Sequence, residues 1–147
     1  MAEYRRSAHA VTDLKYHVIW VTKYRYKILR GDIAERAREL IRQICVAREV
    51  TIIRGAISPD HVHMLVAAPP QLAPAKLVQF IKGRSSRLLQ QEFPALRKRY
   101  WGQQLWARGY YCGSVGAVDE QTIRAYIENQ RWDEDVEGFK ITAPTEP

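Results

Sequence analysis

The chain has 147 residues, of which 46% are hydrophobic and 27% charged, a composition that fits one folded domain and excludes a disordered chain. Its formal net charge of +7 favours a polyanionic partner such as nucleic acid. Because no apolar run is long enough to cross a bilayer, no apolar leader is evident, and the two cysteines form no CxxC or zinc spacing, we expect a cytoplasmic protein without a membrane partner.

The first half of the chain predicts three strands and one helix. A strand is expected over 14–22, where β-branched and aromatic residues dominate. An amphipathic helix follows over 33–48, and Asp32 begins an Asp-x-x-Glu capping pattern in front of it. Two more strands are expected over 50–57 and 61–68. Only Ser-Pro-Asp separates them, which predicts an antiparallel hairpin.

The second half predicts two helices with one strand between them. A helix over 74–92 starts on a proline, which suits the first helical position, and Pro94 ends it. A basic, aromatic loop is expected next. Residues 105–117 predict a fourth strand or a bent pair, weakened by three glycines. Asp119 is the expected N-cap of a last helix over about 120–131.

The predicted order of elements is therefore β-α-β-β-α-β-α, which places the chain in the α+β class. This order fits a ferredoxin-like (RRM-like) βαββαβ sandwich, in which one antiparallel sheet carries two helices on one face. The last helix is additional to that fold. We expect a single domain over 1–147, with a core over about 10–131 and an acidic, mobile tail over about 132–147.

A pair of histidines begins the third predicted strand. Alternation along a strand puts His61 and His63 on one face and turns Val62 to the other. Two adjacent imidazoles are a candidate metal site, although two strand-edge histidines bonded to backbone or water are an equal alternative. No histidine follows the pair, since the other two are His9 and His17. A third ligand is therefore expected to be an oxygen donor, which favours Mg²⁺ or Mn²⁺ over structural zinc.

The last predicted helix supplies candidates for the missing groups. Tyr126 and Gln130 are four residues apart, so they lie on one helical face. Ile123 and Ile127 share the neighbouring face and are expected to pack it onto a core. A phenol could then act as a nucleophile once deprotonated, and an amide carbonyl as a metal ligand. The alternative is that Tyr126 is a packing residue and Gln130 lies on the surface.

Basic residues gather in three clusters, which are interleaved with aromatic residues. They are the sequences KYRYK at 23–27, KGRSSR at 82–87 and RKRYW at 97–101. Nucleic-acid grooves combine such cations, which neutralise phosphates, with aromatic rings, which stack on bases. The alternative is a solvated basic surface without a ligand.

The histidine pair, the terminal helix and the basic surface together resemble the single-tyrosine HUH (His-hydrophobe-His) transposases of the insertion-sequence two-hundred/six-hundred-five family and their repeat-associated relatives. The resemblance covers nearly the whole chain, from YHVIWVTKYRYKIL, GAISPDHVHMLV and KLVQFIKGRSSRLL to LWARGYYCGSVG and YIENQ. It is far more specific than His-Val-His alone, because these segments follow one another in the same order. No key position departs from the family pattern.

The resemblance implies a metal-dependent enzyme that cleaves and rejoins single-stranded DNA. His61, His63 and Gln130 would hold Mg²⁺ or Mn²⁺ on the scissile phosphate, and Tyr126 would attack it to leave a 5′-phosphotyrosine and a 3′-OH. The implied substrate is an insertion-sequence end with a subterminal hairpin, in a prokaryotic cell. A homodimer is also implied, in which a hinge at 116–117 lets one subunit's tyrosine helix complete the other's site in trans. A monomer with its site in cis remains the alternative.

The basic clusters supply candidate DNA contacts. Cations after the first strand and on the second helix are expected at the DNA backbone, and Tyr100 and Trp101 are expected to stack on single-stranded bases. A helix face that also carries Ser85 and Ser86 is alternatively a solvated face. Asp60 is expected to orient a ligand histidine, or else to serve as a turn residue. The basic candidates are Lys23, Arg25, Lys82, Arg84, Arg87, Arg97, Lys98 and Arg99.

Three alternative functions stay open at this point. The nearest is another HUH nuclease, either a domesticated repeat-associated relative or a replication or mobilisation nickase, with the same site chemistry. A non-catalytic ferredoxin-like nucleic-acid-binding module would bind without regard to metal or to Tyr126. A metal-binding protein unrelated to nucleic acid would leave the basic clusters without a purpose.

Overall fold

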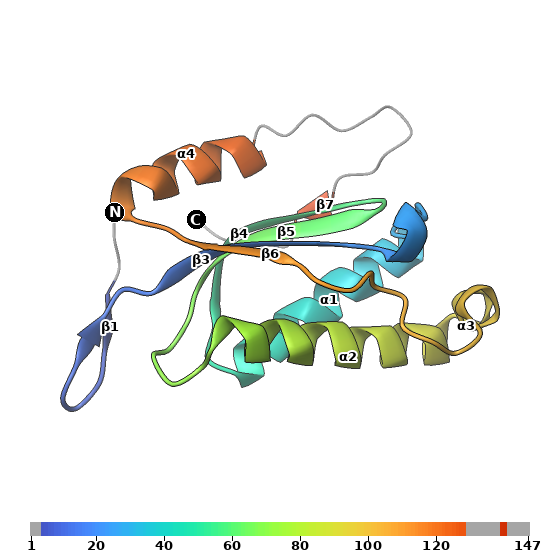
Figure 1. Ribbon diagram of the computed structural model, residues 1–147, viewed down its shortest axis with the longest axis horizontal. Coiled ribbons are helices and arrows are strands. Elements are labelled where there is room, and N and C mark those ends of the chain that lie inside the picture. The colour runs from blue at the N-terminus through green and yellow to red at the C-terminus, as the bar shows by residue number, and fades with distance from the viewer. Residues whose placement is uncertain (1–3, 129–138, 141–147) are drawn as a thin grey trace.

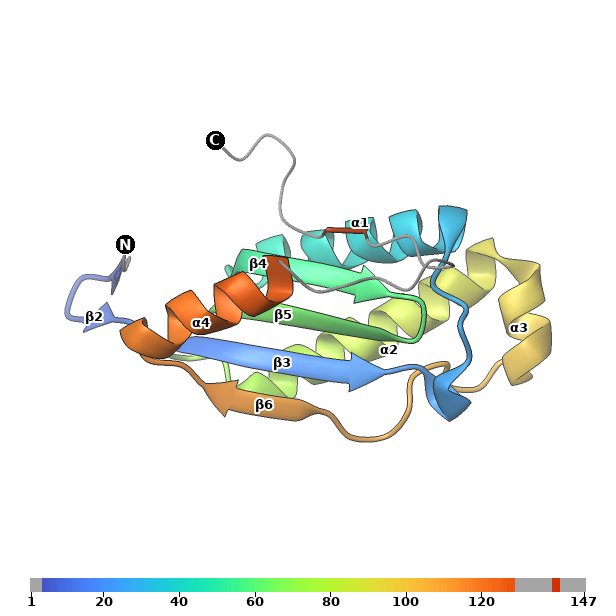
Figure 2. The ribbon, with the colours of Figure 1, turned by 90° about the horizontal axis from the view of Figure 1, so that it is seen from above.

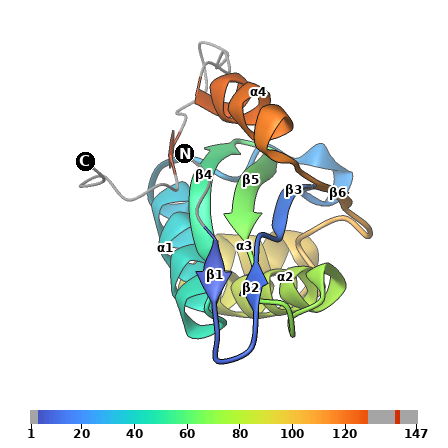
Figure 3. The same ribbon diagram turned by 90° about the vertical axis from the view of Figure 1, so that its left-hand side faces the viewer.

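An antiparallel sheet of five strands, in the order β6-β3-β5-β4-β7, lies at the centre of the computed structural model, which describes residues 4–128 and 139–140 (Figure 1). Helices α1 and α2 cover one face of the sheet, and α4 lies on the other (Figure 3). The elements are β1 (Arg5–Arg6), β2 (Val11–Thr12), β3 (Lys15–Val21), the 3-10 turn η1 (Lys23–Arg25), α1 (Gly31–Ala47), β4 (Thr51–Ser58), β5 (His61–Ala67), α2 (Pro74–Glu92), α3 (Pro94–Tyr100), β6 (Tyr111–Ser114), α4 (Ala117–Glu128) and β7 (Phe139–Lys140).

Strand alternation explains why the sheet is covered on both faces. On β5, Val62, Met64 and Val66 point into the main core beneath α1 and α2. Leu65 points the other way and packs with Ile127 of α4 in a second, smaller core. Figure 2 shows α4 lying over β4 and β5. The predicted ferredoxin-like arrangement is therefore confirmed, and the additional helix covers the face that α1 and α2 leave open.

The predicted hairpin is formed by β4 and β5, which pair antiparallel. Its two-residue turn, Pro59-Asp60, is held against the segment that follows β3. The amide of Thr22 donates a hydrogen bond to the Asp60 carbonyl, and the amide of Leu29 donates to the Pro59 carbonyl, each at 2.9 Å. This tether fixes the end of the central strand at which the histidine pair begins.

The predicted helices are present, but the predicted N-caps at Asp32 and Asp119 are wrong. Helix α1 already begins at Gly31 and α4 at Ala117, so both carboxylates lie in the first helical turn. There they face the positive end of the helix dipole, which stabilises a carboxylate without a capping hydrogen bond. The predicted start of α2 on Pro74 is confirmed.

The region after α2 differs from the expected loop. Residues 94–100 form α3, because Pro94 suits the first helical position and Trp101, in the left-handed conformation, ends the helix. Tyr100 is buried in the main core, so the prediction that it stacks on bases is wrong. Its hydroxyl has no hydrogen-bond partner among the described residues, and burial raises the pKa of Tyr100 to about 12.

The strand predicted over 105–117 is divided into two short contacts with the region of β3. Trp106 forms an isolated bridge with Thr22, and β6 pairs further back along β3. Gly109 lies between them with φ at +81°, a left-handed conformation that favours glycine. This is the bent pair that the sequence allowed, with the bend at a glycine.

The two serines of α2 are buried and do not form a solvated face. The indole Nε1 of Trp106 donates to Ser85 Oγ at 2.9 Å, and the amide of Leu105 donates to Ser86 Oγ at 3.2 Å. Both hydroxyls therefore hold the 105–106 segment against α2. The alternative that assigned Ser85 and Ser86 to solvent is wrong, because a helix can bury small hydroxyls that find partners.

The sequence did not predict strands β1, β2 and β7. Strands β1 and β2 form a separate hairpin before the sheet, and β7 pairs with the edge of β4. Within the described residues, no helix combines the length and apolar character that crossing a membrane requires.

Candidate active site

The histidine pair occupies the first and third positions of the central strand β5. Both imidazoles lie on the α4 side of the sheet, as alternation predicts, and their ring centroids are 5.5 Å apart. His63 is buried, whereas His61, at the end of the strand, is half-buried. The sheet therefore presents two adjacent imidazoles at one place on its outer face.

Helix α4 brings Tyr126 to this pair. Ile123 and Ile127 pack on the second core, as their spacing predicts. The Tyr126 ring then meets His63 edge-on, with ring centroids 5.8 Å apart and an interplanar angle of 77°. Tyr126 nevertheless stays 58% exposed. Gln130, the expected third ligand, lies outside the described residues.

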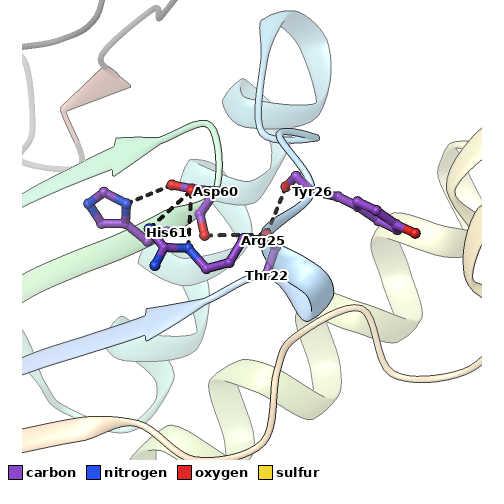
Figure 4. A network of polar contacts seen from close by, with 5 residues as sticks. All are labelled: Thr22, Arg25, Tyr26, Asp60 and His61. Atoms are coloured by element: carbon purple, nitrogen blue, oxygen red, sulfur yellow. Dashed lines mark hydrogen bonds and ion pairs between the residues drawn. The ribbon is translucent and has the colours of Figure 1, made fainter.

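Asp60 connects His61 to the turn after β3 (Figure 4). The Nδ1–H of His61 donates to Asp60 Oδ1 at 2.9 Å. The Nε of Arg25 donates to Asp60 Oδ2 at 3.1 Å, and its Nη2 forms an ion pair with the same oxygen, also at 3.1 Å. Partial burial acts to raise the pKa of Asp60, but the hydrogen bonds from His61 and Arg25 outweigh it and hold this pKa below its ordinary value. Asp60 is thus an ionised partner that can fix the tautomer and orientation of His61.

His17 is a neighbour of the site that the sequence analysis missed. Its ring centroid lies 6.2 Å from that of His63 and 5.8 Å from that of Tyr111. Burial lowers the pKa of His17, and its Nε2 has no hydrogen-bond partner among the described residues. The available signal was the pairing of β3 with β5, which sets His17 opposite Leu65 and so beside the histidine pair.

The donor atoms present fit a divalent metal but not a thiolate zinc site. Cys45 is buried in the main core, where burial raises its pKa to about 12, and Cys112 packs against the same core. Over the described ranges, no three His, Cys, Asp or Glu side chains converge to hold an ion. Imidazole is a general ligand of divalent transition metals, and Mg²⁺ and Mn²⁺ take oxygen donors such as an amide or a phosphate. A metal here would therefore use His61 and His63 together with oxygen ligands.

Two of the predicted DNA-contacting cations are engaged inside the protein. The Lys82 ammonium donates to the carbonyls of Ala107 and Gly109, at 2.7 and 2.9 Å, and partial burial lowers its pKa. Lys82 therefore holds the bend before β6, and its assignment to the DNA backbone stays a prediction. Arg25 is bound to Asp60, although much of its side chain remains exposed.

Two others line an open basic groove between α1 and α2. Arg84 and Arg87 are exposed there beside Arg48 and Lys76, and the lining residues include no carboxylate. The groove has a volume of about 580 Å³. The Arg48 guanidinium lies 3.6 Å from the centroid of the Phe80 ring, which fixes one cation in its wall.

The remaining basic candidates lie near η1 and α3. Residues 97–98 are exposed cations on α3. The Arg99 guanidinium lies 4.5 Å from the centroid of the Tyr26 ring, and the Lys23 ammonium 5.6 Å from that of Tyr24. Cations and aromatic rings thus alternate on this surface, as the sequence predicted.

The fold and the site define a small α+β protein of the ferredoxin-like type, which carries a histidine pair and an exposed tyrosine on the outer face of its sheet. The family model described as "Transposase IS200 like" matches residues 10–130. The chain belongs to the IS200-like transposase family, whose members cleave and join DNA strands. The resemblance found in the sequence is confirmed, and the alternative of a metal-binding protein unrelated to nucleic acid is excluded.

Two curated relatives span most of the chain. The ISDra2 transposase TnpA of Deinococcus radiodurans is 34% identical over 128 residues, covering 87% of this chain and 91% of that protein. The transposase for insertion sequence element IS200 of Salmonella typhimurium is 31% identical over 144 residues, covering 98% of this chain and 93% of that protein. The similarity therefore extends over the whole fold, including the segments that carry the histidine pair and Tyr126.

Two solved structures share the fold. A crystal structure of a Deinococcus radiodurans protein assigned as a transposase has a TM-score of 0.71 and 33% identity, covering 87% of this chain and 98% of that one. A REP-associated tyrosine transposase bound to a REP hairpin has a TM-score of 0.60 and 16% identity, covering 86% of this chain and 70% of that one. At such low identity the second structure supports the fold alone.

Proposed function

We propose that this transposase cleaves and rejoins single-stranded DNA at the ends of an insertion sequence, with Tyr126 as the nucleophile. The observation that carries the proposal is the edge contact between the Tyr126 ring and His63, 5.8 Å between centroids, on a helix that leaves the tyrosine open to solvent. A nucleophile needs this combination, because it must reach both the metal-binding groups and an incoming strand. The reaction would take place in the cytoplasm, where prokaryotic DNA lies.

The chemistry is a pair of phosphoryl transfers. The deprotonated Tyr126 Oη attacks the scissile phosphorus, the bond to the 3′-oxygen breaks, and that oxygen leaves as a 3′-OH after taking a proton. The protein then carries the DNA as a 5′-phosphotyrosine. A 3′-OH from another end attacks this phosphorus and releases the tyrosine. Because the phosphotyrosine conserves the phosphodiester bond, rejoining needs no ATP.

The histidine pair is proposed to hold Mg²⁺ or Mn²⁺, with Gln130 as a third protein ligand. A bound ion would withdraw charge from the non-bridging phosphate oxygens. Asp60 would keep His61 in its ligand orientation, with Arg25 balancing the carboxylate charge. This arrangement supports a metal site in which the outer partners, and not only the ligands, are built into the fold.

We propose a homodimer as the active assembly, because each chain offers one nucleophile and an insertion sequence has two ends. The contact between Tyr126 and His63 within one chain supports a site assembled in cis. Assembly in trans would require α4 to pivot about 116–117 toward the partner subunit. The same catalytic groups would act in either arrangement.

Removal of metal is the first test of this site. A chelator is expected to abolish the covalent adduct that the wild type forms with single-stranded DNA from the flanks of its gene, and added Mn²⁺ or Mg²⁺ to restore it. The His61→Ala/His63→Ala variant is expected to form no adduct at any metal concentration and to lose Mn²⁺ binding in calorimetric titration. The control is His9→Ala, which removes an exposed histidine of the N-terminal hairpin and should behave as the wild type. Full adduct formation in the chelator would contradict the metal site.

The groove between α1 and α2 is proposed to hold the backbone of a DNA hairpin. Its four cations, Arg48, Lys76, Arg84 and Arg87, would neutralise phosphates. A hairpin ligand is also found in the solved REP-associated transposase complex. Helices α1 and α2, whose residues line the groove, lie on the face of the sheet opposite α4 (Figure 3), so a hairpin in the groove would leave the site accessible.

Salt dependence tests this groove. The Arg84→Ala/Arg87→Ala variant is expected to bind a hairpin oligonucleotide about tenfold more weakly, because two phosphate contacts are lost. Each lost contact also reduces the magnitude of the slope of log K against log salt by about 0.9. The slope should therefore fall by about 1.8. The control is Arg6→Ala/Arg42→Ala, which removes two cations outside the groove. An unchanged slope in the first variant would place the hairpin elsewhere.

A further inference from the structure

The turn after β3 holds two residues in an uncommon backbone conformation. Tyr24 has φ at +60° and Arg25 at +55°, both left-handed and neither a glycine. Such residues persist only where the surroundings enforce them, and they cluster at functional sites. Here Thr22 Oγ1 donates to the Tyr26 carbonyl at 2.7 Å, and the amide of Lys23 donates to the carbonyl of Leu105. The turn is thus fixed, and its fixed form leaves Tyr24 70% exposed.

The exposed tyrosine is the outer end of a row of three rings. Tyr24 contacts Tyr26 with centroids 5.4 Å apart, and Tyr26 contacts Tyr100 at 5.9 Å. Their exposed fractions fall from 70% through 37% to 4%, so the row is anchored in the core. Lys23 lies over the first ring and Arg99 over the second. A rigid ring surface flanked by cations is the combination that single-stranded nucleic-acid sites use for sequence-tolerant stacking.

The same turn contacts the candidate active site. Arg25, next to Tyr24, is bound to Asp60, and Asp60 is bound to His61. In Figure 4 the imidazole of His61 and the ring of Tyr26 point away from the turn in opposite directions, with Arg25 between them. A strand whose phosphate lies at the histidine pair would pass Arg25 before its next bases reach the tyrosine row.

A purely structural role does not account for the outer ring. Tyr26 and Tyr100 pack inward and can stabilise the fold, but Tyr24 contributes little burial and holds a left-handed conformation that only glycine adopts without strain. We infer that Tyr24 and Tyr26, with Lys23 and Arg99, form a stacking platform for the bases of single-stranded DNA that flank the scissile phosphate. The inference rests on the proposed function, because it places this platform beside that site.

Binding without cleavage tests the platform. The full-length Tyr126→Phe protein, in a chelator, is titrated with fluorescent dT12 and with an abasic strand of the same length. Adding Tyr24→Ala to this parent protein is expected to weaken its binding of dT12 about tenfold, the effect of losing one stacked base. Its affinity for the abasic strand should stay unchanged. Tyr24→Phe should bind as its parent does. The matched control is Tyr4→Ala, which removes another exposed tyrosine.

A second variant separates stacking from folding. Tyr24→Gly relieves the left-handed conformation, so its Tm should equal or exceed that of the parent while dT12 binding falls as in Tyr24→Ala. Equal loss for dT12 and the abasic strand, or no loss in either variant, would overturn the platform. Because these titrations use no metal and no nucleophile, they are independent of the adduct assay. If the wild type forms the adduct and dT12 binding does not depend on Tyr24, only the platform is refuted. If dT12 binding depends on Tyr24 and the wild type forms no adduct, only the proposed chemistry is refuted.

Discussion

Tyr126→Phe is expected to abolish the covalent DNA–protein adduct and to lower strand cleavage by about 10³-fold or more, as loss of a covalent nucleophile does in other enzymes. The substitution removes only the hydroxyl. The phenylalanine ring can keep the edge contact with His63, and the position is largely exposed, so folding and DNA binding should be retained. Denaturing gels with labelled single-stranded DNA from the gene flanks measure adduct and cleavage together, and a filter-binding titration checks affinity.

Tyr111→Phe is the matched control for this experiment. Tyr111 is also an exposed tyrosine beside the site, where its ring meets His17 with centroids 5.8 Å apart. It should form the adduct at the wild-type rate. If the adduct survives in Tyr126→Phe and is lost in Tyr111→Phe, the nucleophile is Tyr111. If cleavage continues in both variants without an adduct, the histidine pair would act by hydrolysis and the phosphotyrosine would be wrong.

Trp20→Ala is expected to lower the free energy of unfolding by about 3–5 kcal/mol, the usual cost of emptying a buried tryptophan site. Trp20 is fully buried on β3 and meets Trp106 edge-on, with ring centroids 5.9 Å apart. Domains of this size are stable by about 5–15 kcal/mol, so a large share of that free energy of unfolding would be lost. Denaturant titration should show a lower midpoint with an unchanged slope.

Trp101→Ala provides the control, because this tryptophan is 87% exposed. Its effect on unfolding should stay within about 0.5 kcal/mol. Since β3 pairs with β5, which carries the histidine pair, Trp20→Ala should also lose DNA cleavage through unfolding. If both substitutions lowered the free energy of unfolding equally, the main core would not depend on the buried Trp20.

Much of the candidate site was predictable because it depends on local periodicity. Alternation was enough to place His61 and His63 on one face, and helical spacing was enough to pack Ile123 and Ile127 inward beside Tyr126. Both patterns repeat within a few residues and need no knowledge of the rest of the fold. The roles of these side chains in catalysis remain predictions, which the adduct and metal experiments test.

The fates of individual cations were not predictable in this way. Lys82 and Arg25 have the same sequence character as Arg84, yet one holds backbone carbonyls and another an aspartate, while Arg84 lines an open groove. A cluster of basic residues shows that charge is present. It does not show which charges the protein itself uses, because that depends on which acceptors the folded chain brings within reach.

By itself the sequence determined the elements, the β4–β5 hairpin, the faces of the strands and the family. Only the tertiary structure decided that His17 lies beside His63, that Ser85 is buried under Trp106, and that Asp60 joins Arg25 to the site. The physical reason is the range of the interactions. Periodicity acts over a few residues, whereas these contacts join segments about 20 to 46 residues apart and depend on strand register and helix packing, in which a shift of one residue exchanges the two faces of a sheet.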